Sequence, residues 1–232
     1  MGLRRGLLRL MSDLLEQALL RYDGLPVAER FHVHARAFSA PLLAMAARTP
    51  VGAVADIGCG HGLLSALLAL EDPGRTVHGV DPDSRKVAWA RRALAGQPNV
   101  RVEEGTVEET LARGALGRFD AAVVCDVLYL LPESKWAGFL STVRGLLKPG
   151  GRLLLKEVEG DGSWKHRKAL AQEWVMVSLL GRTKASGGMA LKPRAEMTRY
   201  LKDAGFAVRD VVDLGQGYTT PHVLYVAENS VP

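Results

Sequence analysis

One stretch of the sequence decides the fold class: Val54-Ala55-Asp56-Ile57-Gly58-Cys59-Gly60-His61-Gly62-Leu63. An apolar segment ends in an acidic residue, three glycines follow at alternate positions, and a helix-like apolar pattern begins at Leu63. Glycine has no Cβ, so a ligand can approach the backbone of such a turn closely. The free N–H groups at the start of the following helix favour electron-rich ligand groups. The stretch therefore predicts a strand, a tight turn and a helix that bind a nucleotide-like cofactor.

The spacing of the glycines separates two classes of cofactor. The three glycines form a G-x-G-x-G pattern, one residue shorter than the G-x-G-x-x-G pattern of dinucleotide-binding turns. This spacing argues against a nicotinamide cofactor. The next expected strand ends in Asp81, where an acid can accept hydrogen bonds from both ribose hydroxyls of an adenosine. Asp81 could instead cap the following helix, but Asp83 or Ser84 can do that equally well.

The rest of the chain alternates between two kinds of apolar pattern. Strands alternating with helices indicate βαβ units and a parallel sheet. Strands are expected at 51–57, 76–80, 100–103, 119–125, 151–158, 206–214 and 222–227. Helices are expected at 3–19, 27–48, 63–70, 84–95, 107–113, 134–147, 163–180 and 194–204. The fold class is therefore α/β, with a helical extension before the first strand.

Composition narrows the class of protein. The chain has 232 residues, of which 47% are hydrophobic and 24% charged, so one large domain with a real core is expected. The net charge of +5 permits contact with nucleic acid or anionic lipid without requiring it. The two cysteines, Cys59 and Cys125, lack metal-ligand spacing, which favours a reduced, cytoplasmic protein without a metal site.

The N-terminal helix admits two interpretations. Residues 3–19 place leucines at helical spacing, and Arg4, Arg5 and Arg9 stand among them. The apolar run is too short and too often interrupted for a signal peptide or a membrane span. The helix either packs on the domain or a partner subunit, which we favour, or lies as a peripheral element on a membrane surface. The oligomeric state, monomer or homodimer, stays open.

Three further motifs follow the glycine turn in order. They are Val77-His78-Gly79-Val80-Asp81, the run from Phe119 through Cys125-Asp126-Val127-Leu128-Tyr129 to Leu131, and Leu146-Leu147-Lys148-Pro149-Gly150-Gly151-Arg152-Leu153. Together the four motifs resemble the class I S-adenosylmethionine-dependent methyltransferases. The resemblance implies a Rossmann-like, doubly wound αβα sheet of seven strands, mostly parallel with the last strand antiparallel. It also implies S-adenosylmethionine as the cofactor and S-adenosylhomocysteine as its product.

The resemblance also implies which residues bind the cofactor. It places Asp56 near the methionine part, Asp81 on the ribose, and Pro82 against the adenine. Family members often carry an acid after the third strand, where this chain has Thr106, so adenine is expected to meet the Thr106 hydroxyl or backbone groups. The implied cofactor-binding residues are Asp56, Gly58, Cys59, Gly60, Asp81, Pro82, Thr106, Val107, Asp126 and Val127.

The sequence identifies the acceptor-binding and catalytic residues less directly than the cofactor-binding ones. Methyl transfer needs a base only when the acceptor carries a proton of high pKa. Among His34, His166 and His222, His166 is best placed, because ligands in this fold bind outside the carboxyl ends of the strands. We expect His166 and Tyr129 as catalytic residues. The expected acceptor-binding residues are His34, Arg36, Tyr129, Trp164, His166 and Trp174.

The family resemblance and the expected site residues together predict a methyltransferase that acts by in-line displacement on a small acceptor. The apolar helix expected at 163–180 favours an apolar or lipid-like acceptor. The domains expected are a helical extension over 1–50 and a methyltransferase domain over 51–232, with an acceptor-side lid at 163–192. Nucleic-acid methylation is an alternative, disfavoured because Asp126-Val127-Leu128-Tyr129 lacks the Asn/Asp-Pro-Pro-Tyr/Phe motif of base-amine methylation. A non-catalytic nucleotide-binding module is a second alternative.

Overall fold

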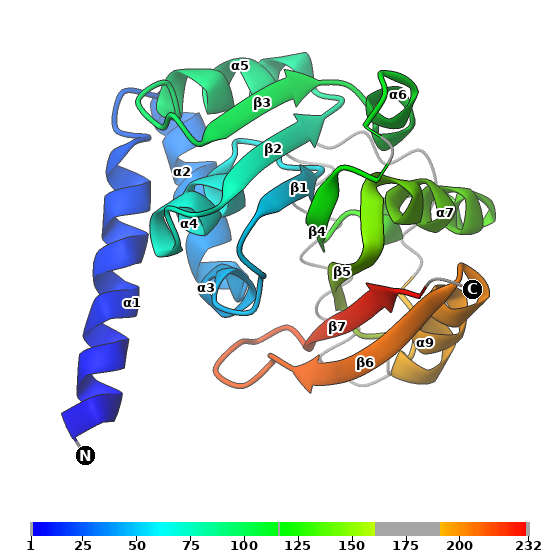
Figure 1. Cartoon of the computed structure of the whole chain (residues 1–232). Coiled ribbons are helices and arrows are strands. Elements are labelled where there is room, and N and C mark those ends of the chain that lie inside the picture. Colours follow the sequence, from blue (N-terminus) through cyan, green and yellow to red (C-terminus); the bar gives the residue numbers. More distant parts are fainter. Residues whose placement is uncertain (1, 116, 161–190, 231–232) are drawn as a thin grey trace. The chain divides into compact units, whose positions relative to one another are not determined.

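The computed structural model describes residues 2–115, 117–160 and 191–230 of the chain (Figure 1). The described chain forms two compact units, Met1–Thr106 and Val107–Pro232, which we call unit 1 and unit 2. Each unit carries its own strands, helices and buried core. The division of the chain at residue 50, expected from the sequence, stays a prediction.

Unit 1 begins with three helices: α1 (Gly2–Leu20), α2 (Val27–Ser39) and α3 (Leu42–Ala46). The sequence predicted one helix over 27–48, and the structure divides it at Ala40, which has φ −131° and ψ 144°. Pro41 follows, and a proline pushes the residue before it out of the helical region. α1 packs against α4 (Leu63–Glu71) and α2, and it buries Ala18 while Tyr22 is buried just beyond its end.

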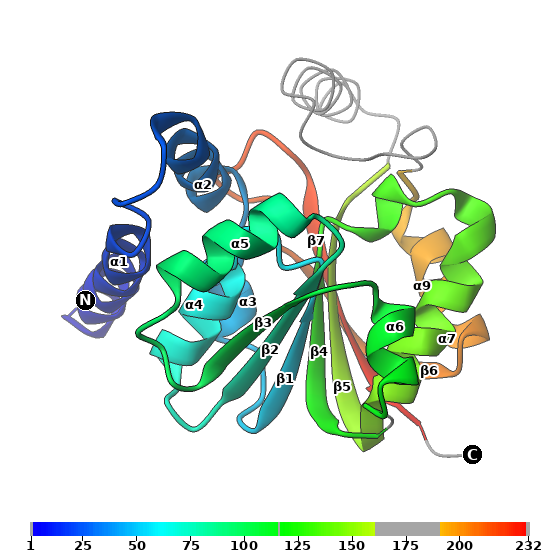
Figure 2. The same cartoon turned by 90° about the horizontal axis from the view of Figure 1, so that it is seen from above.

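Three parallel strands form the sheet of unit 1. They are β1 (Ala53–Ile57), β2 (Thr76–Asp81) and β3 (Val100–Glu104), in the order β3-β2-β1. Figure 2 shows α4 and α5 (Ser84–Ala93) on the same side of these strands. Ile57 pairs with Val80, and Asp81 pairs with Glu104, so the carboxyl ends of the three strands lie level. This edge carries the glycine turn.

Unit 2 has four strands in the order β4-β5-β7-β6. β4 and β5 are parallel, whereas β7 is antiparallel to both of its neighbours. The strands are β4 (Phe119–Cys125), β5 (Leu147–Val158), β6 (Phe206–Asp213) and β7 (His222–Asn229). The helices are α6 (Val107–Ala112), α7 (Trp136–Leu146), α9 (Arg194–Asp203) and the short 3-10 turns η1 (Leu128–Leu130) and η2 (Glu133–Lys135).

The predicted fold class is confirmed: the strands are seven, mostly parallel with β7 antiparallel, and helices accompany them. Most strand boundaries lie within two residues of the predicted ones, and the largest difference is that β5 begins at Leu147, four residues earlier than predicted. Leu147 pairs with Phe119, and the register then shifts so that Arg152 pairs with Ala121. Lys148, Pro149 and Gly150 are exposed and Gly150 has φ 73°, so these three residues loop out within the strand, whereas Gly151 is buried. The helix expected at 163–180 lies outside the described residues.

Candidate functional site

The glycine turn of unit 1 is fixed to the end of β2 by its own backbone. The N–H groups of Gly58 and Cys59 donate to the Val80 carbonyl oxygen at 2.8 and 3.1 Å. The Gly60 N–H donates to Asp81 Oδ2 at 2.8 Å. These bonds use the inward-facing donors of the turn and set its position relative to Asp81.

The glycines of this turn serve different purposes. Gly60 has φ 56°, and a Cβ built on it would meet no atom within 4 Å, so the space over this residue is open to a ligand. Gly62 has φ 77°, but its Cβ would lie 2.7 Å from Leu94 Cδ1, so this glycine permits close packing of α4 on its neighbour. Of these two glycines, Gly60 is the one whose missing side chain leaves room for a bound molecule.

Asp81 is buried, with 7% of its surface exposed, and has capacity for further hydrogen bonds. Oδ1 accepts the Asp83 N–H at 2.9 Å, and Oδ2 accepts that of Gly60. A carboxylate can accept about four hydrogen bonds in all, so the described contacts leave room for two hydroxyl donors. The alternative that Asp81 caps α5 is excluded, because the Asp83 carboxylate caps that helix by accepting from Arg85 and Lys86.

Asp56 lies at the end of β1 beneath the turn. Its Oδ2 accepts a hydrogen bond from the Ser65 hydroxyl at 2.6 Å. Burial, and then the charge of Asp81, raise the pKa of Asp56 to about 7, while the Ser65 hydrogen bond and the charge of Arg36 act in the opposite direction. Burial and the two carboxylates also raise the pKa of the Cys59 thiol, which is therefore a neutral wall residue. The neighbouring carboxyl groups of Asp56 and Asp81 favour a cationic ligand at this end of the sheet.

The N-terminal helical region contacts the glycine turn at His61. The Tyr22 hydroxyl, just after α1, donates to the His61 carbonyl oxygen at 2.9 Å. From α2, Glu29 Oε2 lies 2.8 Å from His61 Nε2, and the His32 ring lies 5.1 Å from the His61 ring. The sequence analysis missed these contacts. No short sequence motif predicts these contacts, because Tyr22 and His61 are far apart in the chain.

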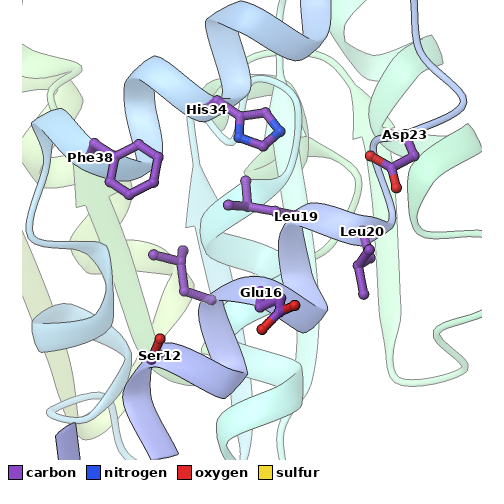
Figure 3. A pocket seen from close by; sticks show the side chains of 8 residues that line it. Ser12, Glu16, Leu19, Leu20, Asp23, His34 and Phe38 are labelled. Atoms are coloured by element: carbon purple, nitrogen blue, oxygen red, sulfur yellow. The ribbon is translucent and has the colours of Figure 1, made fainter. Parts of the chain in front are cut away.

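The remaining predicted residues of unit 1 lie in different surroundings. Arg36 is half-buried, and its charge acts on Asp56. His34 lines a groove between α1 and α2 instead (Figure 3). Pro82 is exposed, and Thr106 is half-buried beside Gly105, whose N–H donates to the Asp81 carbonyl oxygen at 3.1 Å.

In unit 2 a buried ion pair holds the loop after β4. Lys156 is fully buried, and its Nζ donates to both carboxylate oxygens of Asp126 at 2.6 Å. The Asp126 N–H donates to the Lys156 carbonyl oxygen at 2.9 Å. Asp126 has φ 58°, the one positive value among the non-glycine residues described. The ion pair holds Asp126 in a backbone conformation that residues other than glycine rarely adopt.

Glu157 supports the same loop from the next position of β5. Its Oε1 accepts the N–H of Leu128 at 2.9 Å and that of Val127 at 3.3 Å. Its Oε2 is buried and has no hydrogen-bond partner in the described part of the chain. Burial, and then the charge of Asp126, raise the pKa of Glu157 well above the ordinary carboxyl value. The sequence analysis missed Lys156 and Glu157, although charged residues inside an apolar strand were a usable signal.

The other predicted residues of unit 2 divide into two groups. Val107, Tyr129 and His222 are described and buried, and the Tyr218 ring meets that of His222 edge-on at 5.1 Å. His166, Trp164 and Trp174 lie outside the described residues. Within the described ranges no group of three or more His, Cys, Asp or Glu side chains is arranged to hold a metal ion. No helix in those ranges is long and apolar enough to cross a membrane.

Comparison with known families identifies the class of protein. The family profile described as "Methyltransferase domain" matches residues 29–211. The chain belongs to this methyltransferase family. The ubiquinone biosynthesis O-methyltransferase of Pseudomonas paraeruginosa is 28% identical over 170 residues, which cover 73% of this chain and 70% of that protein. The chain is therefore an S-adenosylmethionine-dependent enzyme, as the four motifs indicated.

Solved structures agree on the fold of the methyltransferase. The Burkholderia thailandensis 1,6-didemethyltoxoflavin-N1-methyltransferase, with bound 1,6-didemethyltoxoflavin and S-adenosylhomocysteine, has a TM-score of 0.65 and 22% identity, covering 93% of this chain and 89% of its own. An O-methyltransferase family protein from the same organism has a TM-score of 0.67 and 20% identity. The match with this second protein covers 87% of the present chain and 59% of the Burkholderia chain.

The residues of unit 1 fit S-adenosylmethionine. The cofactor carries a positive sulfonium and an ammonium group, and the buried carboxylates Asp56 and Asp81 provide the opposite charge. The open space over Gly60 allows close approach to the backbone, and Asp81 retains acceptor capacity for ribose hydroxyls. The observed chemistry of the turn thus matches the cofactor that the family uses.

Proposed function

We propose that this methyltransferase methylates a hydroxyl oxygen of a small, largely apolar acceptor, and that Glu157 takes the hydroxyl proton. The observation that carries the proposal is the buried Oε2 of Glu157 at the carboxyl end of β5, which has no hydrogen-bond partner among the described residues. Ligands of doubly wound sheets bind outside these strand ends. A relative named as an O-methyltransferase supports a hydroxyl acceptor.

The raised pKa of Glu157 suits it to this task. A carboxylate of ordinary pKa is a weak base toward a hydroxyl, whereas burial and the charge of Asp126 make Glu157 a stronger one. Its Oε1 is anchored by the Leu128 N–H, so Oε2 is held in a fixed direction. Lys156 neutralises Asp126 and thereby limits how far the negative charge of Asp126 raises the pKa of Glu157.

In the proposed methyl transfer, Glu157 is the one protein group that takes up a proton. S-adenosylmethionine supplies an electrophilic methyl group whose bond to sulfur breaks with its electron pair left on sulfur. Glu157 accepts the proton that the acceptor hydroxyl loses as its oxygen forms the new bond to carbon. Water then takes the proton from Glu157 before the next turnover. Burial of the site excludes competing water from the methyl group.

We further propose how the donor is held. The residues that would hold its ribose and methionine parts are Asp81, Asp56 and the Gly58-Cys59-Gly60 backbone, supported by the acceptor capacity of Asp81 and the open space at Gly60. Pro82, Thr106 and Val107 would meet the adenine, and Asp126 and Val127 the methionyl side. His166 and Tyr129 as catalytic residues, and a peripheral membrane contact, stay predictions.

The test is Glu157→Gln, measured with S-adenosylmethionine and a panel of phenols, catechols and apolar alcohols. The Gln amide oxygen can still accept the Leu128 and Val127 N–H groups, so the loop keeps its support while the base is lost. We expect kcat to fall by about 10²- to 10⁴-fold with donor affinity unchanged. The matched control is Glu228→Gln on β7, where the half-buried carboxylate pairs with Arg209 at 2.9 Å.

The pH profile adds an independent readout. The wild-type rate should rise with pH through the raised pKa of Glu157, above the ordinary carboxyl range of about 4.3. The profile of Glu157→Gln should lack this limb, and a ¹³C titration of the Glu carboxyls should show one that titrates high without any substrate. Equal kcat in wild type and Glu157→Gln would remove Glu157 from the mechanism. No methylation of any hydroxyl by the wild type would instead overturn the acceptor class.

A further inference from the structure

Helix α2 buries a charged residue and exposes large apolar ones. Glu29 is buried, and its Oε2 lies 2.8 Å from His61 Nε2 of the glycine turn. On the outer side of the helix, Val27 is 77% exposed, and Phe31 and Phe38 are each 69% exposed. A surface helix of a single domain normally has the reverse arrangement, with its apolar side toward the core. The outer side of α2 is therefore a candidate binding surface.

The exposed residues of α2 have the spacing of a seam between two helices. We call the α2 stripe the four residues separated by four, three and four positions, Val27, Phe31, His34 and Phe38. This is the a/d spacing of a coiled coil, and it is narrower than the side with which a helix packs on a core. Figure 3 shows that the stripe adjoins the groove between α1 and α2, because His34 and Phe38 line that groove together with Leu19 and Leu20. A narrow stripe of this kind fits another helix.

Charges of both signs border the α2 stripe. Glu16 and Asp23 line the adjoining groove, and both are exposed. Arg30 is exposed on α2, three residues after Val27 and four before His34, and such residues are neighbours on a helix surface. An anionic membrane would repel the two carboxylates. A surface that carries both signs can complement a copy of itself, so the charges favour a second copy of this chain as the partner.

The exposed area is enough for a reversible dimer. A phenylalanine buries about 150–250 Å² when it is covered, so the exposed parts of Phe31 and Phe38 supply roughly 400–700 Å² over two copies. Val27 and the 59% exposed Leu20 add to this area. Specific interfaces begin at about 1,200 Å² in total, and the weak, reversible ones lie near or below that value. The dimer is therefore expected to dissociate on dilution.

We propose that the α2 stripe packs antiparallel against the α2 stripe of a second copy of this chain, about a two-fold axis. Such an interface is isologous, so each contact is made twice. One register pairs all four positions, with Val27 against the partner's Phe38 and Phe31 against the partner's His34. All four residues lie on one side of α2, as this register requires. It places a small side chain opposite a large one and an aromatic ring opposite an imidazole ring, so the two stripes interdigitate.

One substitution at two valines tests the stripe. Val27→Asp should raise the dissociation constant of the dimer about 30-fold or more, because each copy would bury an unpaired carboxylate against the partner's Phe38. Val27 is the first residue of α2, where an acidic side chain favours the helix, so the variant weakens the dimer without unfolding α2. The matched control is Val51→Asp, at a valine that is 56% exposed and lies outside α2, and it should stay within about twofold of wild type. Sedimentation velocity over a concentration series measures all three chains.

Cross-linking tests the antiparallel register. The variants Val27→Cys and Phe38→Cys are mixed in equal amounts, allowed to exchange partners and mildly oxidised. We expect one disulfide-linked dimer that contains one chain of each variant, which intact mass spectrometry identifies because the two variants differ in mass. Each variant alone is the matched control, since either residue lies about 16 Å along the helix from its own copy. That is beyond the roughly 7 Å Cα separation that a disulfide spans. The wild type, whose two cysteines are free, is the blank.

Several outcomes would overturn the proposal. A wild-type chain that stays monomeric throughout the concentration series contradicts it, as does a dimer that Val27→Asp and Val51→Asp weaken equally. Disulfides formed mainly between chains of the same variant contradict the antiparallel register. A monomer that binds phosphatidylglycerol vesicles, and loses them in Val27→Asp, would assign the α2 stripe to a lipid surface instead. None of these measurements depends on the methyl acceptor or on Glu157.

Discussion

Two loops at strand ends are held by opposite means. The glycine turn after β1 is fixed by backbone donors, by neutral groups such as the Tyr22 hydroxyl, and by its own positive φ values. The loop after β4 is fixed by the buried Lys156–Asp126 pair and by Glu157. Among the described residues, no buried cation is hydrogen-bonded to Asp56 or Asp81 beside the first loop, whereas the second loop holds the buried cation Lys156. The difference matches our proposal that unit 1 binds the cationic donor and that Glu157 of unit 2 takes the proton.

The largest effect should come from breaking the ion pair of unit 2. Lys156→Met leaves Asp126 buried without its partner and should lower the free energy of unfolding by about 3–5 kcal/mol. The matched control is Lys148→Met, whose exposed pair with Asp120 at 2.7 Å should contribute about 1 kcal/mol or less. Urea unfolding measures both. Equal losses would show that the Lys156 pair is not desolvated.

The donor side is tested next at Gly60. Gly60→Val fills the open space over the turn and strains a residue at φ 56°, so S-adenosylmethionine affinity should fall by about 100-fold or more. Gly114→Val is the control, because Gly114 has φ 87° with equally open surroundings and no place in the turn. It should lower stability similarly and leave affinity unchanged. Loss of binding in both variants would mean that backbone strain alone disrupts the site.

The pKa of Asp56 predicts a pH effect of intermediate size. An acid whose pKa is raised on folding binds more protons in the folded state, so stability falls as pH rises from about 4 to about 7. The Asp56→Asn variant should have a shallower slope than the wild type, with the remainder coming from Glu157, and it should be more stable at neutral pH, yet bind S-adenosylmethionine about tenfold more weakly. Melting temperatures across this range, with and without cofactor, measure both effects. A wild type without the slope would contradict the raised pKa.

The smallest effect concerns the clamp from α1. Tyr22→Phe removes one hydrogen bond to the His61 carbonyl and should lower S-adenosylmethionine affinity about fivefold, matching roughly 1 kcal/mol for a buried bond. Tyr200→Phe in unit 2, at a half-buried residue outside the glycine turn, is the control. An unchanged affinity in Tyr22→Phe would show that the turn keeps its shape without the N-terminal helices.

The sequence predicted one of these loops much better than the other. The glycine turn and Asp81 depend on local rules, namely positive φ, helix capping and strand ends, and short motifs record such rules. The roles of Glu157 and Tyr22 depend on contacts with Leu128 and His61, which are distant in the chain. The end of α2 at Ala40 could also have been predicted from Pro41, which follows it. The prediction instead extended one helix through Ala40.

One titration tests the central claim, that the turn and Asp81 hold the donor while Glu157 serves the acceptor. S-adenosylhomocysteine is titrated calorimetrically into wild type, Asp81→Asn and Glu157→Gln at one pH. We expect Asp81→Asn to bind about 30-fold more weakly, as for a lost charged acceptor of two hydroxyls, and Glu157→Gln to bind as wild type does. Unchanged affinity in Asp81→Asn, or weakened affinity in Glu157→Gln, would contradict this division of roles.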